Sequence, residues 1–174
     1  MGMKGLVSGL STSIVALALA GGAATAAFGD SQLGHSGSRD RGPAAHKQHT
    51  AELARVVRNA TRRFRDVNVA KAEGYQLMFG CVSGPDDGAM GLHYVNLALV
   101  ADPAVDPRQP EIVIYEPLPN GGRRLIGADF LVFAEGWHAT NTNTPELMGQ
   151  LMHLIDSPNR YGLPSFYTLH VWAW

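Results

Sequence analysis

The sequence predicts an α+β fold in which an antiparallel sheet packs with one long N-terminal helix and one short helix. Apolar residues recur at spacings of three and four over residues 51–73, which is the helical period. Several later segments alternate apolar and polar residues, as strands with one buried face do. Asn120-Gly121-Gly122 is a hairpin-turn signal. Hairpins, together with helices that are kept apart from the strands, favour an antiparallel sheet over a parallel βαβ fold.

The first 26 residues have the pattern of a secretory signal peptide. Lys4 supplies a positive charge, Leu6–Ala20 is mostly apolar, and Ala24-Thr25-Ala26 fits the small-residue cleavage pattern. The apolar run is shorter than the roughly 20 residues of a membrane-spanning helix. We therefore expect export, to the periplasm or the medium, without a permanent membrane anchor. Residues 27–49 have no apolar periodicity and predict a flexible linker, which leaves residues 50–174 as a single domain.

A long helix is predicted from Ala51 to Glu73. Thr50 is a suitable N-cap residue, and Gly74 is a suitable residue to end the helix. A single apolar stripe would face the sheet, and it is formed by Leu53, Val56, Val57, Ala60, Phe64 and Val67.

Alternation with a period of two predicts the strands, and a short helix is predicted before the last of them. The helix would begin at Thr144-Pro145-Glu146, where a cap residue, a proline and an acid follow one another, and end near Asp156. The predicted strands cover residues 75–82, 92–100, 111–116, 124–134 and 166–174.

Composition narrows the classes of function. The 174 residues include 14 Lys+Arg and 15 Asp+Glu, so we expect no strongly basic surface and no nucleic-acid partner. The single cysteine, Cys81, excludes an internal disulfide framework and a cysteine-rich zinc site. The glycine-rich segments match neither a phosphate-binding loop nor a nucleophile elbow.

Five side chains are the predicted metal ligands. His93 and Glu116 each fall on a strand face that otherwise carries aliphatic residues, where a bare carboxylate is costly unless it is paired or bound to metal. Glu135 and His138 are three residues apart, which brings them together if that segment is helical. His170 lies among aromatic residues on the last strand. Imidazole and carboxylate ligands together suit Zn²⁺, Fe²⁺, Mn²⁺, Cu²⁺ or Ni²⁺.

The reaction stays open at this point. His153 is a reserve ligand, although its place on the predicted short helix favours exposure to solvent. Three ligands with an open coordination position would permit either hydrolysis or an oxygen-dependent oxidation. The sequence therefore does not decide whether the domain is an enzyme.

Two other interpretations of the same residues also stay open. Each histidine can be a core residue whose ring N–H donates to a backbone carbonyl. The chain can also be a non-enzymatic secreted or cell-envelope protein that holds a small molecule in an apolar pocket. Aromatic residues that could line such a pocket are Tyr94, Trp137, Trp172 and Trp174.

Five short motifs resemble those of an exported bacterial protein family of unknown function. The two longest are Gly88–Asn96 (GAMGLHYVN) and Pro158–Trp174 (PNRYGLPSFYTLHVWAW), and the shorter ones are residues 115–117, 134–138 and 147–150. The resemblance covers roughly residues 65–174 and implies no established activity. It also implies a C-terminal tail that ends near a cysteine, which this chain lacks after Trp174. Cys81 would then be the partner of that missing cysteine.

Overall fold

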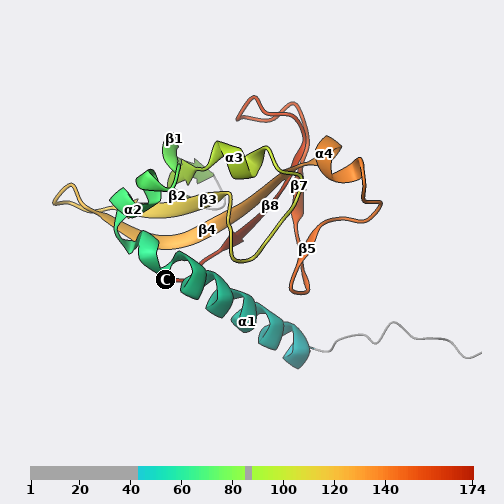
Figure 1. Cartoon of the computed structure of the whole chain (residues 1–174), viewed down its shortest axis with the longest axis horizontal. Helices are drawn as coiled ribbons and strands as arrows, with labels where there is room; N and C mark the ends of the chain where they lie inside the picture. The colour runs from blue at the N-terminus through green and yellow to red at the C-terminus, as the bar shows by residue number, and fades with distance from the viewer. Residues whose placement is uncertain (1–42, 85–87) are drawn as a thin grey trace, which may run out of the picture. The chain divides into compact units, whose positions relative to one another are not determined.

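The structure, a computed structural model, describes residues 43–84 and 88–174, and its architecture is shown in Figure 1. The predicted signal peptide and most of the predicted linker lie outside these residues. The helices are α1 (Pro43–Thr61), the 3-10 helix η1 (Arg62–Arg65), α2 (Val67–Ala72), α3 (Leu97–Val100) and α4 (Ala134–His138). The strands are β1 (Gln76–Gly84), β2 (Gly88–Val95), β3 (Ile112–Pro117), β4 (Arg123–Phe133), β5 (Glu146–Leu147), β6 (Gln150–Leu151), β7 (His153–Ile155) and β8 (Phe166–Val171).

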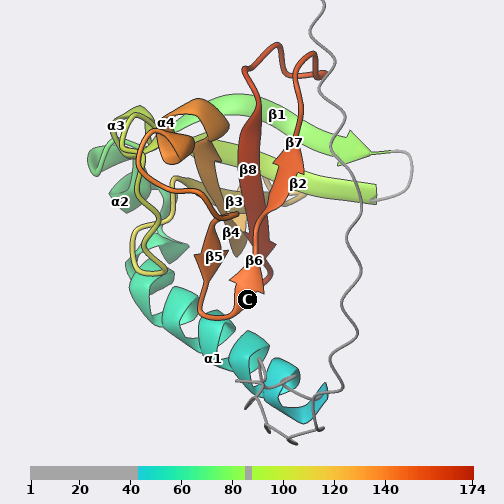
Figure 2. The ribbon, with the colours of Figure 1, turned by 90° about the vertical axis from the view of Figure 1, so that its right-hand side faces the viewer.

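The strands confirm the predicted α+β class with an antiparallel sheet. Six strands form one sheet in the order β1-β2-β3-β4-β8-β7, and β5 pairs with β6 in a separate hairpin. Every strand pair is antiparallel. The sheet is curled (Figure 2), and residues of both edge strands, β1 and β7, line one cavity. None of the helices in the described part of the chain is long and apolar enough to cross a membrane.

The N-terminal helix packs against one face of the sheet. Leu53 and Val57 of α1 are 2% and 0% exposed, and they belong to one core cluster with Phe130 and Val132 of β4. Figures 1 and 2 show α1 running along this side of the sheet. The helix begins at Pro43, several residues before the predicted start at Ala51. Proline is well tolerated at the first position of a helix, where its missing N–H would have no partner.

The predicted single helix over residues 51–73 is wrong in one respect, because the structure divides it into α1, η1 and α2. Asp66 has extended backbone angles, and its side chain accepts a hydrogen bond from the Asn68 backbone N–H at 2.9 Å. This is N-cap geometry, so Asp66 begins a new helix rather than continuing the old one. Gly74, with a φ of +95°, lies just beyond the end of α2, as predicted.

Two further predicted elements are corrected. The strand predicted over residues 92–100 ends at Val95, because the Asn96 side chain accepts hydrogen bonds from the backbone N–H groups of Ala98 and Leu99 and caps α3. The short helix predicted over residues 144–156 is absent, and β5, β6 and β7 occupy its place. Met148 and Gly149 both have positive φ, at 50° and 85°, which suits a two-residue hairpin turn between β5 and β6.

Candidate metal centre

Strand register brings three ligand-type side chains to the sheet face opposite α1. Asp129 of β4 is paired directly with His170 of β8, and also with Ile112 of β3. His93 of β2 is paired with Ile114, two residues along β3 from Ile112. Because residues two apart on a strand share a face, His93, Asp129 and His170 lie on the same side of the sheet.

These three side chains form a compact group. One nitrogen or oxygen atom from each lies within 4.8 Å of the corresponding atoms of the other two. His93 and Asp129 are buried, at 5% and 4% exposure, and the His170 side chain is 27% exposed. Ligands on one ion, each about 2.0–2.2 Å from it, lie at most about 4.4 Å apart. Small side-chain rotations would therefore allow the group to hold a metal ion.

A hydrogen bond fixes the orientation of His93. Its Nδ1 lies 3.1 Å from the carbonyl oxygen of Gly91. A carbonyl only accepts, so Nδ1 carries the proton and the Nε2 lone pair is free to bind a metal. The backbone of Gly91 has a φ of +99°, and a Cβ there would lie 2.7 Å from the Tyr115 carbonyl oxygen. Glycine at residue 91 therefore permits the local conformation of β2 that presents this carbonyl to His93.

Asp129 is oriented in the same way by a neighbour on β8. The Thr168 hydroxyl donates to Asp129 Oδ1 at 2.5 Å, which leaves Oδ2 facing His170. Hydrogen bonds of this kind hold metal-ligating carboxylates in place and tune their affinity. The His170 ring stacks on Trp172, with ring centroids 5.8 Å apart and an interplanar angle of 29°.

The Nε2 atom of His170 has no ordinary hydrogen-bond partner among the described residues, although it is buried. Asp129 Oδ2 lies 3.6 Å away, which is beyond hydrogen-bond length. Burial lowers the pKa of His93, and the negative charge of Asp129 opposes that shift. Neutral imidazole is the form that binds metal. A buried nitrogen without a hydrogen-bond partner, beside a carboxylate, is suited to binding a metal ion.

The structure brings two of the predicted ligands, His93 and His170, into this group and adds Asp129. Asp129 is the only charged residue between Leu125 and Phe133, within a strand of otherwise apolar or small residues. The argument that singled out Glu116, a carboxylate on an apolar strand, applies equally to Asp129. The sequence therefore carries a signal for Asp129 that the predicted set of ligands does not include.

Glu116 does not join the group. It is paired in register with Arg124 of β4, whose Nε donates to Glu116 Oε2 at 2.7 Å. The Glu116 side chain is 41% exposed, so solvent and an arginine satisfy its charge.

Glu135 and His138 lie together on α4, and both are exposed, away from the group of three. His138 Nδ1 lies 3.0 Å from the carbonyl oxygen of Asn141 and therefore donates to it. Its Nε2 then accepts from the Tyr167 hydroxyl at 2.9 Å. His138 thus has the arrangement of a histidine whose ring is satisfied by its neighbours. His153 is exposed on β7 and lies on the cavity wall rather than in the group.

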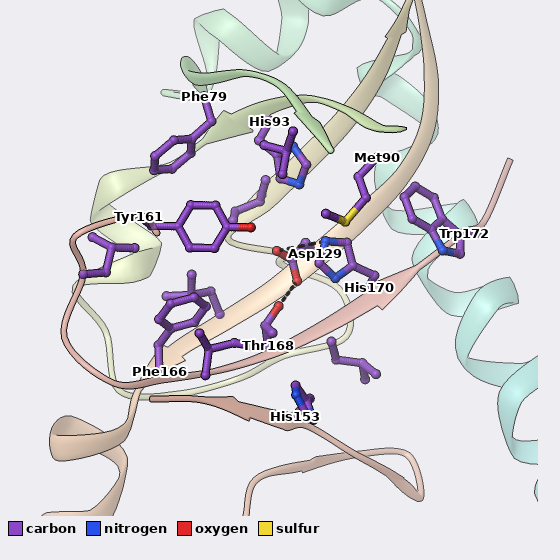
Figure 3. A pocket seen from close by; sticks show the side chains of 16 residues that line it. Phe79, Met90, His93, Asp129, His153, Tyr161, Phe166, Thr168, His170 and Trp172 are labelled. Carbon is purple, nitrogen blue, oxygen red and sulfur yellow. Dashed lines mark hydrogen bonds and ion pairs between the residues drawn. The ribbon is translucent and has the colours of Figure 1, made fainter. Parts of the chain in front are cut away.

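The group of three lies in the wall of a cavity of about 520 Å³ (Figure 3). All six strands of the large sheet contribute to this cavity, and most of its lining is apolar. The volume falls within the range of about 300–1,000 Å³ that is usual for small-molecule sites. The fold therefore presents the candidate ligands to a space large enough for an organic molecule.

Comparisons of the chain with known protein families, with curated protein sequences and with solved structures give no match. The resemblance to the exported family, which was based on short motifs, stays a prediction.

Proposed function

We propose that this chain binds one divalent transition-metal ion through His93 Nε2, Asp129 Oδ2 and His170 Nε2. The observation that supports the proposal most strongly is the convergence of two imidazoles and a carboxylate from three strands within 4.8 Å. The unpartnered Nε2 of His170 and the hydrogen bonds to His93 Nδ1 and Asp129 Oδ1 support it further. Because the sequence predicts a signal peptide, we also propose that the domain works outside the cytoplasm.

The donor set restricts the metal. Two imidazole nitrogens and one carboxylate oxygen suit Zn²⁺, Fe²⁺, Mn²⁺, Cu²⁺ and Ni²⁺, whereas Mg²⁺ and Ca²⁺ prefer oxygen ligands alone. Two histidines and a carboxylate that leave other positions open are the ligands of non-haem Fe²⁺ oxygenases and of several catalytic zinc sites. Three protein ligands would therefore leave the ion able to bind a further molecule.

The cavity favours a second candidate function that is compatible with the first. A space of about 520 Å³ with a mainly apolar lining is suited to holding a small organic molecule without transforming it. In that case the domain is an exported binding protein, and the metal contributes affinity rather than chemistry.

The metal site is tested by titration of the chain from Ala27 onward, prepared without a histidine tag and stripped with a chelator. Zn²⁺ is added, and bound metal is measured by elemental analysis after equilibrium dialysis. We expect one equivalent in the unmodified chain and a loss of that equivalent in both His93→Ala and His170→Ala. Each variant removes one of only three protein ligands.

The matched control is His153→Ala, which removes a histidine of the same cavity that lies outside the group of three. It should keep one equivalent. Circular dichroism establishes that each variant is folded. Retention of the full equivalent by folded His93→Ala and His170→Ala would contradict the proposal, and would assign the metal to other histidines of the chain.

A further inference from the structure

The cavity beside the proposed metal site has an apolar end that the metal does not need. Phe79 of β1 contacts Tyr161, which precedes β8, with ring centroids 5.7 Å apart. Tyr161 in turn contacts Phe166 of β8, with centroids 6.2 Å apart. Leu163 and Ile155 add aliphatic surface to the same wall. Three aromatic rings in edge contact around one space favour an aromatic occupant.

The charged lining of the cavity is concentrated at the group of three. No lysine or arginine lines it among the residues that the structure describes, and Asp129 is its one carboxylate in that part of the chain. A divalent ion bound by Asp129 would carry a net charge of about +1, which one anionic ligand would neutralise. An anionic group that enters this apolar space therefore finds its counter-charge at the ion.

Neighbouring groups of the protein already contact one side of each proposed metal ligand. The Gly91 carbonyl accepts a hydrogen bond from His93 Nδ1, and the Thr168 hydroxyl donates one to Asp129 Oδ1. The Trp172 ring stacks on His170. In Figure 3 the Tyr161 hydroxyl points from the cavity wall toward the group of three. This hydroxyl has no hydrogen bond to any residue in the described ranges, so it is available to a ligand.

We propose that the cavity binds a small aromatic molecule that carries one oxyanion group, such as an aryl carboxylate. The anionic oxygen would bind the metal, the second oxygen would accept a hydrogen bond from Tyr161, and the ring would lie near Phe79 and Phe166. This inference rests on the proposed metal site, because no lysine or arginine lines the cavity in the described ranges to hold the anion. It adds the chemical class of the ligand.

The test uses benzoate and acetate as probes of the Co²⁺-loaded chain from Ala27 onward. Co²⁺ replaces Zn²⁺ because its visible absorption reports a new ligand. We expect benzoate to bind at least about tenfold more tightly than acetate, because only benzoate buries a ring in the apolar end. We also expect no benzoate binding to the metal-free chain. Tyr161→Phe should weaken the binding of benzoate by about tenfold or more, through the loss of one hydrogen bond to a charged group.

A matched pair of variants on β7 locates the ring. Ile155 lines the cavity, whereas its neighbour Leu154 is exposed and does not. Ile155→Asn should weaken the binding of benzoate at least fivefold, because it alters the apolar wall. The affinities for acetate and for Co²⁺ should stay unchanged. Leu154→Asn should change the affinity for neither benzoate nor acetate. Unchanged Co²⁺ affinity shows that each variant is folded.

The possible failures are distinguishable. Stoichiometric Co²⁺ binding at the group of three, with benzoate no tighter than acetate, would overturn the aromatic ligand and leave the metal site standing. Equal benzoate binding with and without metal would overturn the anchoring of the anion by the ion. A chain that binds no Co²⁺ would overturn the metal site and, with it, this inference.

Discussion

Asp129→Asn is expected to reduce metal affinity by more than about 100-fold while the protein stays folded. Asparagine has the same shape, and its amide oxygen can still accept the hydrogen bond from the Thr168 hydroxyl. It cannot supply the negative charge that a divalent ion needs in a site where Asp129 is 4% exposed. Loss of an outer hydrogen-bond partner alone typically costs 10–100-fold, so removal of a direct charged ligand should cost more.

Thermal unfolding with and without Zn²⁺ measures this effect. A metal at about 100 times its dissociation constant stabilises a folded protein by about 2.7 kcal/mol, so the melting temperature of the unmodified chain should rise with Zn²⁺. The melting temperature of Asp129→Asn should not rise with Zn²⁺. Glu116→Gln is the matched control, because Glu116 is a strand carboxylate outside the group, paired with Arg124. Equal Zn²⁺ shifts in the unmodified chain and in Asp129→Asn would exclude Asp129 as a ligand.

Glu111→Gln is expected to remove most of the loss of stability that the metal-free protein undergoes between about pH 5 and pH 8. Glu111 is 2% exposed, and its Oε2 accepts a hydrogen bond from the Leu131 backbone N–H at 3.0 Å. Burial raises the pKa of Glu111 to about 8, and the charge of Asp129 adds to the shift. In the unfolded chain the same carboxyl group titrates near 4.5.

The sign follows from where the proton is held. Between these two pKa values the folded protein keeps the Glu111 proton and the unfolded chain releases it, so the free energy of unfolding falls as pH rises. Each pKa unit corresponds to about 1.4 kcal/mol, so the total reaches several kcal/mol. Glutamine is neutral at every pH and can still accept from the Leu131 N–H, so it should abolish this slope.

Urea unfolding of the metal-free protein at several values between pH 5 and pH 8 provides the measurement. The difference between the unmodified chain and Glu111→Gln isolates residue 111, because all other groups titrate in both proteins. Glu135→Gln is the control, since Glu135 is exposed on α4 and should leave the slope unchanged. If Glu111→Gln keeps the slope of the unmodified chain, Glu111 is not a buried, protonated carboxyl group.

Local pattern predicted those parts of the fold that local interactions determine. The apolar stripe through Leu53 and Val57 identified the helix that packs on the sheet, and Asn120-Gly121-Gly122 identified the turn between β3 and β4. Local competition explains the failures. The cap residues before Glu146 favoured a helix, but the positive φ angles of Met148 and Gly149 turn the chain into a hairpin instead. The sequence pattern alone does not show whether a helix or a hairpin forms there.

The candidate site was predicted in part for the same reason. Alternation along single strands showed that His93 and His170 fall among apolar neighbours, and both belong to the group of three. The pairing of Asp129 with His170 joins residues 41 positions apart, and such register is set by contacts between strands rather than by either strand alone. The pairing of Glu116 with Arg124 likewise depends on the register of β3 and β4.

The location of a bound ion tests the central claim most directly. Crystals of the chain from Ala27 onward, soaked in Zn²⁺, give an anomalous signal that marks the metal without assumptions about its ligands. We expect one strong peak about 2.0–2.2 Å from atoms of His93, Asp129 and His170, facing the cavity. A peak elsewhere, with these three side chains unliganded at saturating Zn²⁺, would contradict it.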